Sequence, residues 1–314
     1  MKAIAVILIN LTAGIACLIT GVNLMSSNLE KLNLSRIRRA LSRFTANVFT
    51  SLITGTVITA ITQSSTAVTL ITVSLVNSGV LNLYQAVGII YGANIGTTVT
   101  AQFISFNIAG LAPYLLVCGL GIKFFTKKRS LKLVGMAITG FGLMVSGIKI
   151  LGWSIPYIEK SSFIKDILTR FSSNPWLGLI AGTFATMLVQ SSSATVGLTI
   201  VLFNGGLIDL NSAISLILGD NIGTCFTAQL ASIRASLPAK QAALAHTLYN
   251  IIGSIIILLF LSRFSSLVIA LTNILGQEKS RLVANAHTLF NIISAVVFLP
   301  FTRYYVKFIE WLTT

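Results

Sequence analysis

Long apolar stretches recur along this chain and restrict its fold more than any other feature. Several approach or exceed about 18 residues, the length that a helix needs to cross a bilayer. The composition agrees, because 54% of the 314 residues are hydrophobic and only 9% are charged, whereas soluble domains carry roughly 25% charged residues. We therefore expect an all-α polytopic membrane protein. The expected spans are residues 3–25, 80–105, 108–125, 131–152, 207–231, 241–262 and 282–301.

The net charge of +15 is better explained by membrane orientation than by nucleic-acid binding, because the basic residues gather on one side of the expected topology. That side holds Lys31, Arg36, Arg38, Arg39, Arg43, Lys123, Lys127, Lys128, Arg129, Lys132, Arg234, Lys240, Arg303 and Lys307. The side richer in basic residues faces the cytoplasm. We expect seven crossings of the cytoplasmic membrane, with the N-terminus outside, the C-terminus inside, and no nucleic-acid partner.

An internal repeat divides the chain. Residues 45–105 align with residues 172–232 without a gap, and 26 of the 61 paired positions are identical. The pairs include Gln63-Ser64-Ser65 with Gln190-Ser191-Ser192, and GANIGTTVTAQ from Gly92 with GDNIGTCFTAQ from Gly219. Upstream, ITGVNLMSSN from Ile19 resembles ITGFGLMVSG from Ile138. We expect a first repeat over residues 1–125, a second over 126–262, and an amphipathic segment, last span and tail over 263–314.

The charge pattern indicates that the two repeats are inverted. The basic segment at 31–43 has a counterpart near 157–171, where Lys160, Lys165 and Arg170 are offset by Glu159 and Asp166, as expected for opposite sides of the membrane. For this topology to be consistent, residues 48–78 and 175–206 must each enter the membrane and return to the side from which they came. We therefore expect two re-entrant helical hairpins whose QSS tips meet near the midplane. Inverted repeats with broken helices are typical of secondary transporters.

The residue types at the tips indicate which ions they could hold. Glutamine carbonyls and hydroxyls are neutral oxygen ligands that suit Na⁺, and the sequence has neither a carboxylate cage nor a Cys/His cluster for another metal. The helix starts that follow the tips suit an anion. The segments Asn94–Thr98 and Asn221–Cys225 each carry a mid-span glycine, so we expect these helices to unwind locally and to complete a cation shell. The alternative is that these small residues only allow close helix packing.

With its paired QSS and NIGT motifs, the chain resembles the bacterial branch of the type II sodium-dependent phosphate cotransporter family. The resemblance covers roughly residues 10–255. It implies that Gln190, Ser191, Ser192, Thr224 and Thr227 ligate sodium, and that Gln63, Ser64, Ser65, Thr97 and Thr100 complete the substrate cavity. The full candidate sodium set is Gln190, Ser191, Ser192, Ser193, Thr224, Thr227, Asp220, Asn221, Gln63, Thr97 and Thr100. The candidate phosphate set is Ser64, Ser65, Thr66, Asn94, Ser191 and Ser192.

Two positions depart from the pattern of the family and of the repeat. Thr66 stands where the fuller motif has a third serine, and Asp220 pairs with Ala93 in the other repeat. Asp220 is an acid inside the membrane, which by default suggests function. It either contributes to a cation site or is a structural acid paired with a polar neighbour.

Two further features stay open. AHTLYN (Ala245–Asn250) and AHTLFN (Ala286–Asn291) each place a histidine and an asparagine one helical turn apart. His246 and His287 either respond to pH or join helices through hydrogen bonds. Cys17, Cys118 and Cys225 lack metal or redox spacing, and we expect them to be small buried side chains.

A Na⁺-coupled phosphate transporter accounts best for these features, with Na⁺ as the coupling ion, the bilayer as surroundings and no cofactor. Another oxyanion, or coupling to protons, would fit the residues too, and the oligomeric state is open. A channel would share the repeat but has no filter motif here. An intramembrane hydrolase would need a nucleophile with His and Asp partners, and Ser191 has no G-x-S-x-G context. We therefore do not expect an enzyme.

Overall fold

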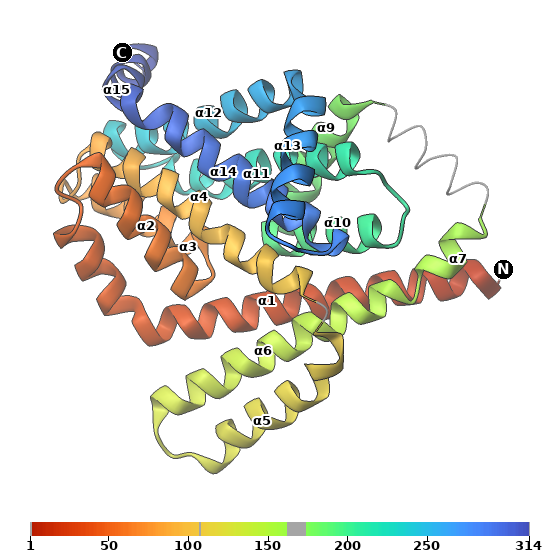
Figure 1. Cartoon of the computed structure of the whole chain (residues 1–314). Coiled ribbons are helices and arrows are strands. Elements are labelled where there is room, and N and C mark those ends of the chain that lie inside the picture. Colours follow the sequence, from red (N-terminus) through yellow and green to blue (C-terminus); the bar gives the residue numbers. More distant parts are fainter. Residues whose placement is uncertain (1, 107, 162–173, 314) are drawn as a thin grey trace.

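The computed structural model describes residues 2–106, 108–161 and 174–313, and all regular structure in them is helical (Figure 1). The all-α prediction is thus confirmed. The first half contains α1 (Lys2–Arg43), α2 (Val48–Thr62), α3 (Ser65–Asn77), α4 (Leu83–Ser105), η1 (Ala109–Leu111), α5 (Ala112–Phe125), α6 (Arg129–Gly152) and α7 (Ile155–Glu159). The second half contains α9 (Pro175–Val189), α10 (Ser192–Asn204), α11 (Leu210–Ser232), α12 (Leu237–Leu259), α13 (Leu261–Ile274), η2 (Lys279–Arg281), α14 (Leu282–Phe298), η3 (Leu299–Phe301) and α15 (Thr302–Thr313).

The sequence repeat appears as a repeat of helices. The helices α2, α3 and α4 contain 15, 13 and 23 residues, and α9, α10 and α11 have the same lengths in the same order. Every boundary in the second set is shifted by the 127 residues that separate the two QSS motifs. The duplicated sequence therefore encodes the same three-helix unit twice.

Polar caps begin these helices at matching positions. Asn47 accepts a hydrogen bond from the amide of Thr50 at the start of α2, and Asn174 caps α9 at the equivalent place. The helices α4 and α11 start after Asn82 and Asp209, whose side chains accept from backbone amides of the first turn. Such caps satisfy amides that lack a partner inside the helix, each contributing about 1 kcal/mol.

The NIGT segments do not unwind, so the expectation of helices broken at this point is wrong. The helices α4 and α11 continue through Gly96 and Gly223. A Cβ on Gly96 would lie 2.5 Å from the carbonyl oxygen of Thr56, and one on Gly223 would lie 2.5 Å from that of Thr183. These glycines are required because α2 packs directly on α4, and α9 on α11.

The helix α1 is longer than the predicted span. It continues from Lys2 to Arg43 without interruption, about 63 Å at 1.5 Å per residue, so the basic segment 31–43 is its C-terminal part. It lies alongside α6 (Figure 1). A Cβ on Gly21 would lie 2.2 Å from the amide nitrogen of Met144. The two helices that correspond between the repeats are therefore packed against each other.

Helix length and apolarity support a multi-pass membrane protein but not all seven expected spans. The helix α5 has 14 residues, about 21 Å, which is shorter than the roughly 30 Å hydrocarbon core. The helix is interrupted at Phe260, between α12 and α13, so the last residues of the expected span 241–262 belong to a separate helix. Lys165, Asp166 and Arg170, which entered the charge argument, lie outside the described residues. Within the described residues, the stretches long and apolar enough to cross a bilayer are Ile4–Arg43, Arg129–Glu159, Leu237–Leu259 and Lys279–Thr313.

The cysteines differ in exposure. Cys225 is buried, Cys17 is half-buried and Cys118 is exposed on α5. The expectation that all three are buried is wrong for Cys118, because α5 packs mainly on α6 and leaves its other faces uncovered (Figure 1).

Candidate functional site

Both QSS segments form the same break between two helices. Gln63 follows the last residue of α2 and caps it, with φ 56° and ψ 31°, and Gln190 caps α9 in the same way, with φ 54° and ψ 28°. In the described part of the chain these are the only non-glycine residues with positive φ. A left-handed residue other than glycine costs about 1–2 kcal/mol. Each glutamine is followed by a serine with an extended backbone, Ser64 or Ser191, and the next helix, α3 or α10, begins directly after that serine.

The two breaks meet at one polar cavity of about 280 Å³. Residues of both repeats line it, and one face of α1 covers it. The structure therefore brings together most of the residues that the sequence proposed for the site. The lining residues are Gln63, Ser64, Ser65, Thr66, Thr97, Gln190, Ser191, Ser192 and Ser193 from the repeats, and Val22, Asn23, Ser26, Ser27 and Glu30 from α1.

A second, much smaller cavity adjoins the break of the second repeat. Its volume of about 10 Å³ is that of a single water or small ion. The lining residues are Thr66, Thr186, Met187, Gln190, Ser192, Gly223, Thr224, Phe226 and Thr227. Thr66, Gln190 and Ser192 line both cavities, so the two are connected through shared side chains.

In the first repeat, the matching residues are bound to one another. The Thr100 hydroxyl donates to Gln63 Oε1 at 2.8 Å, and the Ser65 hydroxyl donates to Thr97 Oγ1 at 3.4 Å. All four side chains are buried. The side chains of this cluster are therefore paired with one another by hydrogen bonds.

In the second repeat, the equivalent side chains are not joined. The Thr224 and Thr227 hydroxyls donate to backbone carbonyls of their own helix at 2.8 and 3.1 Å. No hydrogen bond in the described chain links the side chains of Gln190, Ser192, Thr224 and Thr227 to one another. Their oxygens surround the small cavity instead, so this copy can accept an additional ligand.

Asp220 lies behind the small cavity. Its side chain is 1% exposed, and its Oδ1 accepts a 2.8 Å hydrogen bond from the Thr186 hydroxyl. Thr186 lines the cavity and also lies 2.8 Å from Thr195 Oγ1. Oδ2 has no hydrogen-bond partner within the described residues. Asp220 lines neither cavity, so any effect on a ligand there would pass through Thr186.

Asn94 is held by α12 and does not line either cavity. Its amide donates to Asn250 Oδ1 at 2.8 Å, and its Oδ1 lies 3.4 Å from His246 Nε2. These contacts agree with the helix-joining role considered for the AHTLYN motif, and they do not favour Asn94 as a phosphate ligand. Asn221 likewise lines neither cavity and donates to a carbonyl of its own helix, that of Ile217.

The two AHT motifs make one further contact in common. Gln102 of α4 donates to the Thr288 hydroxyl at 2.8 Å, and Gln229 of α11 donates to the Thr247 hydroxyl at 2.6 Å. The glutamines are equivalent in the repeat, and the threonines are equivalent in the motif. The helices α14 and α12 therefore hold α4 and α11 in the same way. His287 is buried, and its Nδ1 has no partner in the described chain.

Sequence reasoning missed the contribution of α1. Asn23, Ser26, Ser27 and Glu30 follow the i, i+3, i+4, i+7 spacing of one helix face, and all line the larger cavity. The Ser26 hydroxyl donates to the backbone carbonyl of Gln63 at 2.8 Å, which fixes the first break to α1. This polar stripe within an apolar helix was a readable signal.

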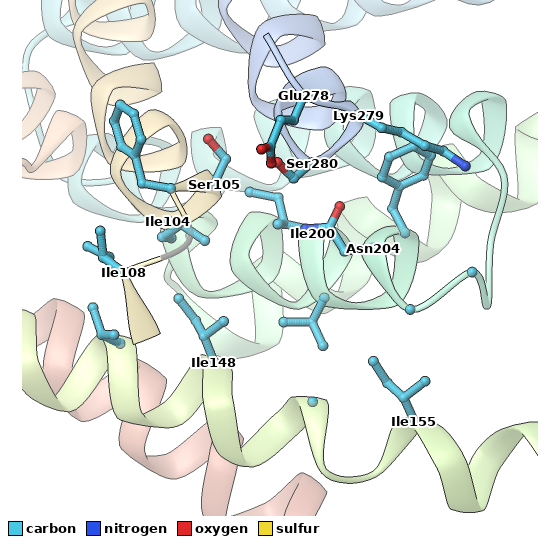
Figure 2. Close-up of a pocket in the computed structure, with 17 residues that line it drawn as sticks. Ile104, Ser105, Ile108, Ile148, Ile155, Ile200, Asn204, Glu278, Lys279 and Ser280 are labelled. Carbon is cyan, nitrogen blue, oxygen red and sulfur yellow. The ribbon is translucent and has the colours of Figure 1, made fainter. Parts of the chain in front are cut away.

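A more voluminous cavity lies away from both QSS segments. It measures about 440 Å³ and lies between the end of α4, α6, α10 and η2 (Figure 2). Isoleucines from several helices line it, and Glu278, Lys279 and Ser280 lie along one side (Figure 2). No residue of either repeat motif lies in it, so we do not assign the site there.

The helical, apolar chain thus carries one polar cavity between two copies of the same helical unit, and sequence comparison gives its family. The profile of the Na⁺/Pi-cotransporter family matches residues 17–152 and 160–276. The chain belongs to the Na⁺/Pi-cotransporter family.

Individual relatives cover different shares of the chain. YqeW of Bacillus subtilis, which is uncharacterized, is 32% identical over 259 residues, or 82% of this chain and 83% of YqeW. YjbB of Salmonella typhimurium, named as a candidate inorganic phosphate export protein, is 27% identical over 83% of this chain but only 48% of its own length. Sodium-dependent phosphate transport protein 2A of Rattus norvegicus is 32% identical over 33% of this chain and 18% of its own length. No solved structure matches the chain.

Proposed function

We propose that this protein is a secondary transporter that couples Na⁺ to the movement of inorganic phosphate across the cytoplasmic membrane. The observation that carries the proposal is the single polar cavity lined by both QSS breaks. Family membership supports phosphate as the substrate. The names of two relatives, one for sodium-dependent phosphate transport and one for phosphate export, support the same substrate.

The small cavity is the proposed Na⁺ site. Gln190, Ser192, Thr224 and Thr227 supply neutral oxygens around a volume of one ion, with Thr66 contributed by the other repeat. Hard neutral oxygens suit an alkali cation that must later be released. The closed cluster around Gln63 in the first repeat is a weaker candidate, because its oxygens already accept hydrogen bonds from Thr100 and Ser65.

The larger cavity is the proposed phosphate site. The helices α3 and α10 begin at Ser65 and Ser192 on its wall, and their first amides and positive dipole ends attract an anion. The hydroxyls of Ser64, Thr66 and Ser191 add donors.

Coupling follows from the residues that line both cavities. Na⁺ held by Gln190 and Ser192 would fix the second break, and with Thr66 it would also fix the first, so that both present their donors to phosphate. Each ligand then raises the affinity for the other, as linkage requires. In this proposal the repeats 1–125 and 126–262 are inverted, and segments 48–78 and 175–206 are re-entrant hairpins. Alternating access of the shared site then moves both ligands together.

Export is a second candidate direction, and the name of YjbB favours it. A coupled carrier works in either direction, since the combined gradients of both ligands determine net flux. An outward Na⁺ gradient imposed on loaded vesicles should therefore drive phosphate out. Phosphate efflux at the same rate with and without the Na⁺ gradient would instead identify an exporter that is not coupled to Na⁺.

The test is uptake of radiolabelled phosphate into proteoliposomes, with an inward Na⁺ gradient compared with an equal K⁺ gradient. Accumulation above the external concentration with Na⁺ alone, lost in Gln190→Ala, is the expected result. Uptake that never exceeds the external concentration would indicate a channel. If folded protein shows no Na⁺-dependent uptake, the proposal fails for this substrate and ion, and sulfate and a proton gradient come next.

A further inference from the structure

Glu30 gives the larger cavity an unexpected charge. It is the only charged residue among those that line this cavity within the described residues. It lies on the polar face of α1 with Asn23, Ser26 and Ser27, and its side chain is half-buried. No salt bridge or hydrogen bond involves its carboxylate in the described part of the chain. The neighbouring Lys31 is exposed and does not line the cavity.

A carboxylate beside an anion site selects among anions. Two negative groups at one site repel each other unless they share a proton. At neutral pH, phosphate and arsenate still carry a proton and can donate it in a charge-assisted hydrogen bond to a carboxylate. Sulfate carries no proton at this pH and offers only lone pairs. A site built to accept a hydrogen bond from its substrate strongly rejects an analogue that lacks the donor.

We propose that Glu30 determines specificity by accepting a hydrogen bond from a protonated tetrahedral oxyanion in the larger cavity, which excludes sulfate because sulfate has no proton to donate. The inference rests on the proposed phosphate site and adds the basis of its selectivity. The positive end of each helix, α3 and α10, attracts any oxyanion without distinguishing phosphate from sulfate. Glu30 supplies the discrimination that these helices lack.

The alternative role for Glu30 is Na⁺ binding, and the geometry favours it less. An ion needs several oxygens at close range, and the small cavity of about 10 Å³ provides this arrangement without Glu30. The cavity that Glu30 lines has about 280 Å³, which is too wide to close around one bare cation. The corresponding position of the second repeat is Lys149, which is exposed on α6, so the carboxylate is specific to one side of the site.

The test compares Glu30→Gln with wild type in proteoliposomes at neutral pH. Radiolabelled phosphate uptake is measured with increasing unlabelled sulfate or arsenate, at saturating Na⁺. In wild type, arsenate should inhibit and sulfate should not. In Glu30→Gln, the KM for phosphate should rise about tenfold or more, the scale of one charge-assisted hydrogen bond, and sulfate should become an inhibitor. Glu30→Asp should keep the rejection of sulfate.

Glu159→Gln is the matched control, because it makes the same change on the exposed surface of α7 and should behave as wild type. If Glu30→Gln binds but does not transport, calorimetric titration with phosphate and with sulfate in Na⁺ buffer measures the same ratio. Unchanged discrimination with a raised half-saturating Na⁺ concentration would overturn the inference in favour of Na⁺ binding. Unchanged discrimination without that shift would also overturn it. Wild type without Na⁺-dependent phosphate uptake would instead remove the proposed function itself.

Discussion

At the scale of single residues, the two copies of one motif differ in what their side chains contact. Gln63 accepts a hydrogen bond from Thr100, whereas Gln190 and Thr227 face a small cavity. The sequence shows these pairs as identical, since no property of the residues themselves distinguishes them. The difference arises from packing around each copy, and only the three-dimensional structure reveals it.

This difference predicts unequal effects of the same substitution. Thr227→Val should raise the half-saturating Na⁺ concentration for phosphate uptake about tenfold, because the proposed Na⁺ site loses one of its lining oxygens, with little effect on folding. Thr100→Val, its matched control, should lower the free energy of unfolding by about 1 kcal/mol, since Gln63 loses its donor, and leave Na⁺ dependence nearly unchanged. Equal Na⁺ shifts in both variants would contradict the assignment of the ion to the second repeat.

Asp220 allows a similar comparison. Asp220→Asn can still accept from Thr186, so the protein should fold, but the half-saturating Na⁺ concentration should rise because Thr186, which lines the small cavity, loses its carboxyl partner. Asp209→Asn is the control, because Asp209 caps α11 where the first repeat has Asn82. Unaltered Na⁺ dependence of uptake in Asp220→Asn would make Asp220 a structural acid.

At the scale of helices, the sequence predicted much of the arrangement and misread part of it. The repeat, the breaks at Gln63 and Gln190 and their convergence on one cavity follow from the paired motifs. The mid-span glycines suggested unwinding, but they serve close packing, because a glycine in sequence does not show whether a neighbouring backbone approaches it. The role of α1 was missed because hydropathy averages over the polar face that carries Glu30.

Close packing predicts which glycines can be replaced. A Cβ on Gly219 would lie 2.1 Å from the carbonyl oxygen of Leu179 on α9, whereas nothing lies within 4 Å of one on Gly121 in α5. Gly219→Ala should therefore destabilise the protein by about 1–3 kcal/mol through overpacking. Gly121→Ala should leave stability unchanged or raise it by up to about 1 kcal/mol. Thermal unfolding in detergent measures both. Equal melting temperatures would show that α9 and α11 are not in such close contact.

At the scale of the whole molecule, the two repeats are expected to lie in the membrane with opposite orientations. The two chain ends lie far apart in the molecule (Figure 1). The expected topology puts the ends of hairpin 48–78 on the cytoplasmic side and those of hairpin 175–206 outside. Hydropathy alone could not settle this, because the hairpin helices are apolar but only 13 or 15 residues long.

Cysteine labelling tests that arrangement. In a background without Cys17, Cys118 and Cys225, Ser78→Cys should react with a membrane-impermeant thiol reagent only in inside-out vesicles. Asn204→Cys should react only in intact cells or right-side-out vesicles. Both positions are exposed at the ends of α3 and α10. Labelling of both from the same side would contradict the inverted repeat.

The central claim is that Na⁺ and phosphate move together through one site, and simultaneous flux measures this most directly. Proteoliposomes would receive radiolabelled Na⁺ and phosphate with distinguishable isotopes, and both uptakes would be followed in the same sample. We predict a fixed ratio of Na⁺ to phosphate across a range of concentrations of either ligand, with both fluxes lost together in Gln190→Ala. Phosphate uptake that continues without Na⁺ uptake, or a ratio that varies with concentration, would contradict the account.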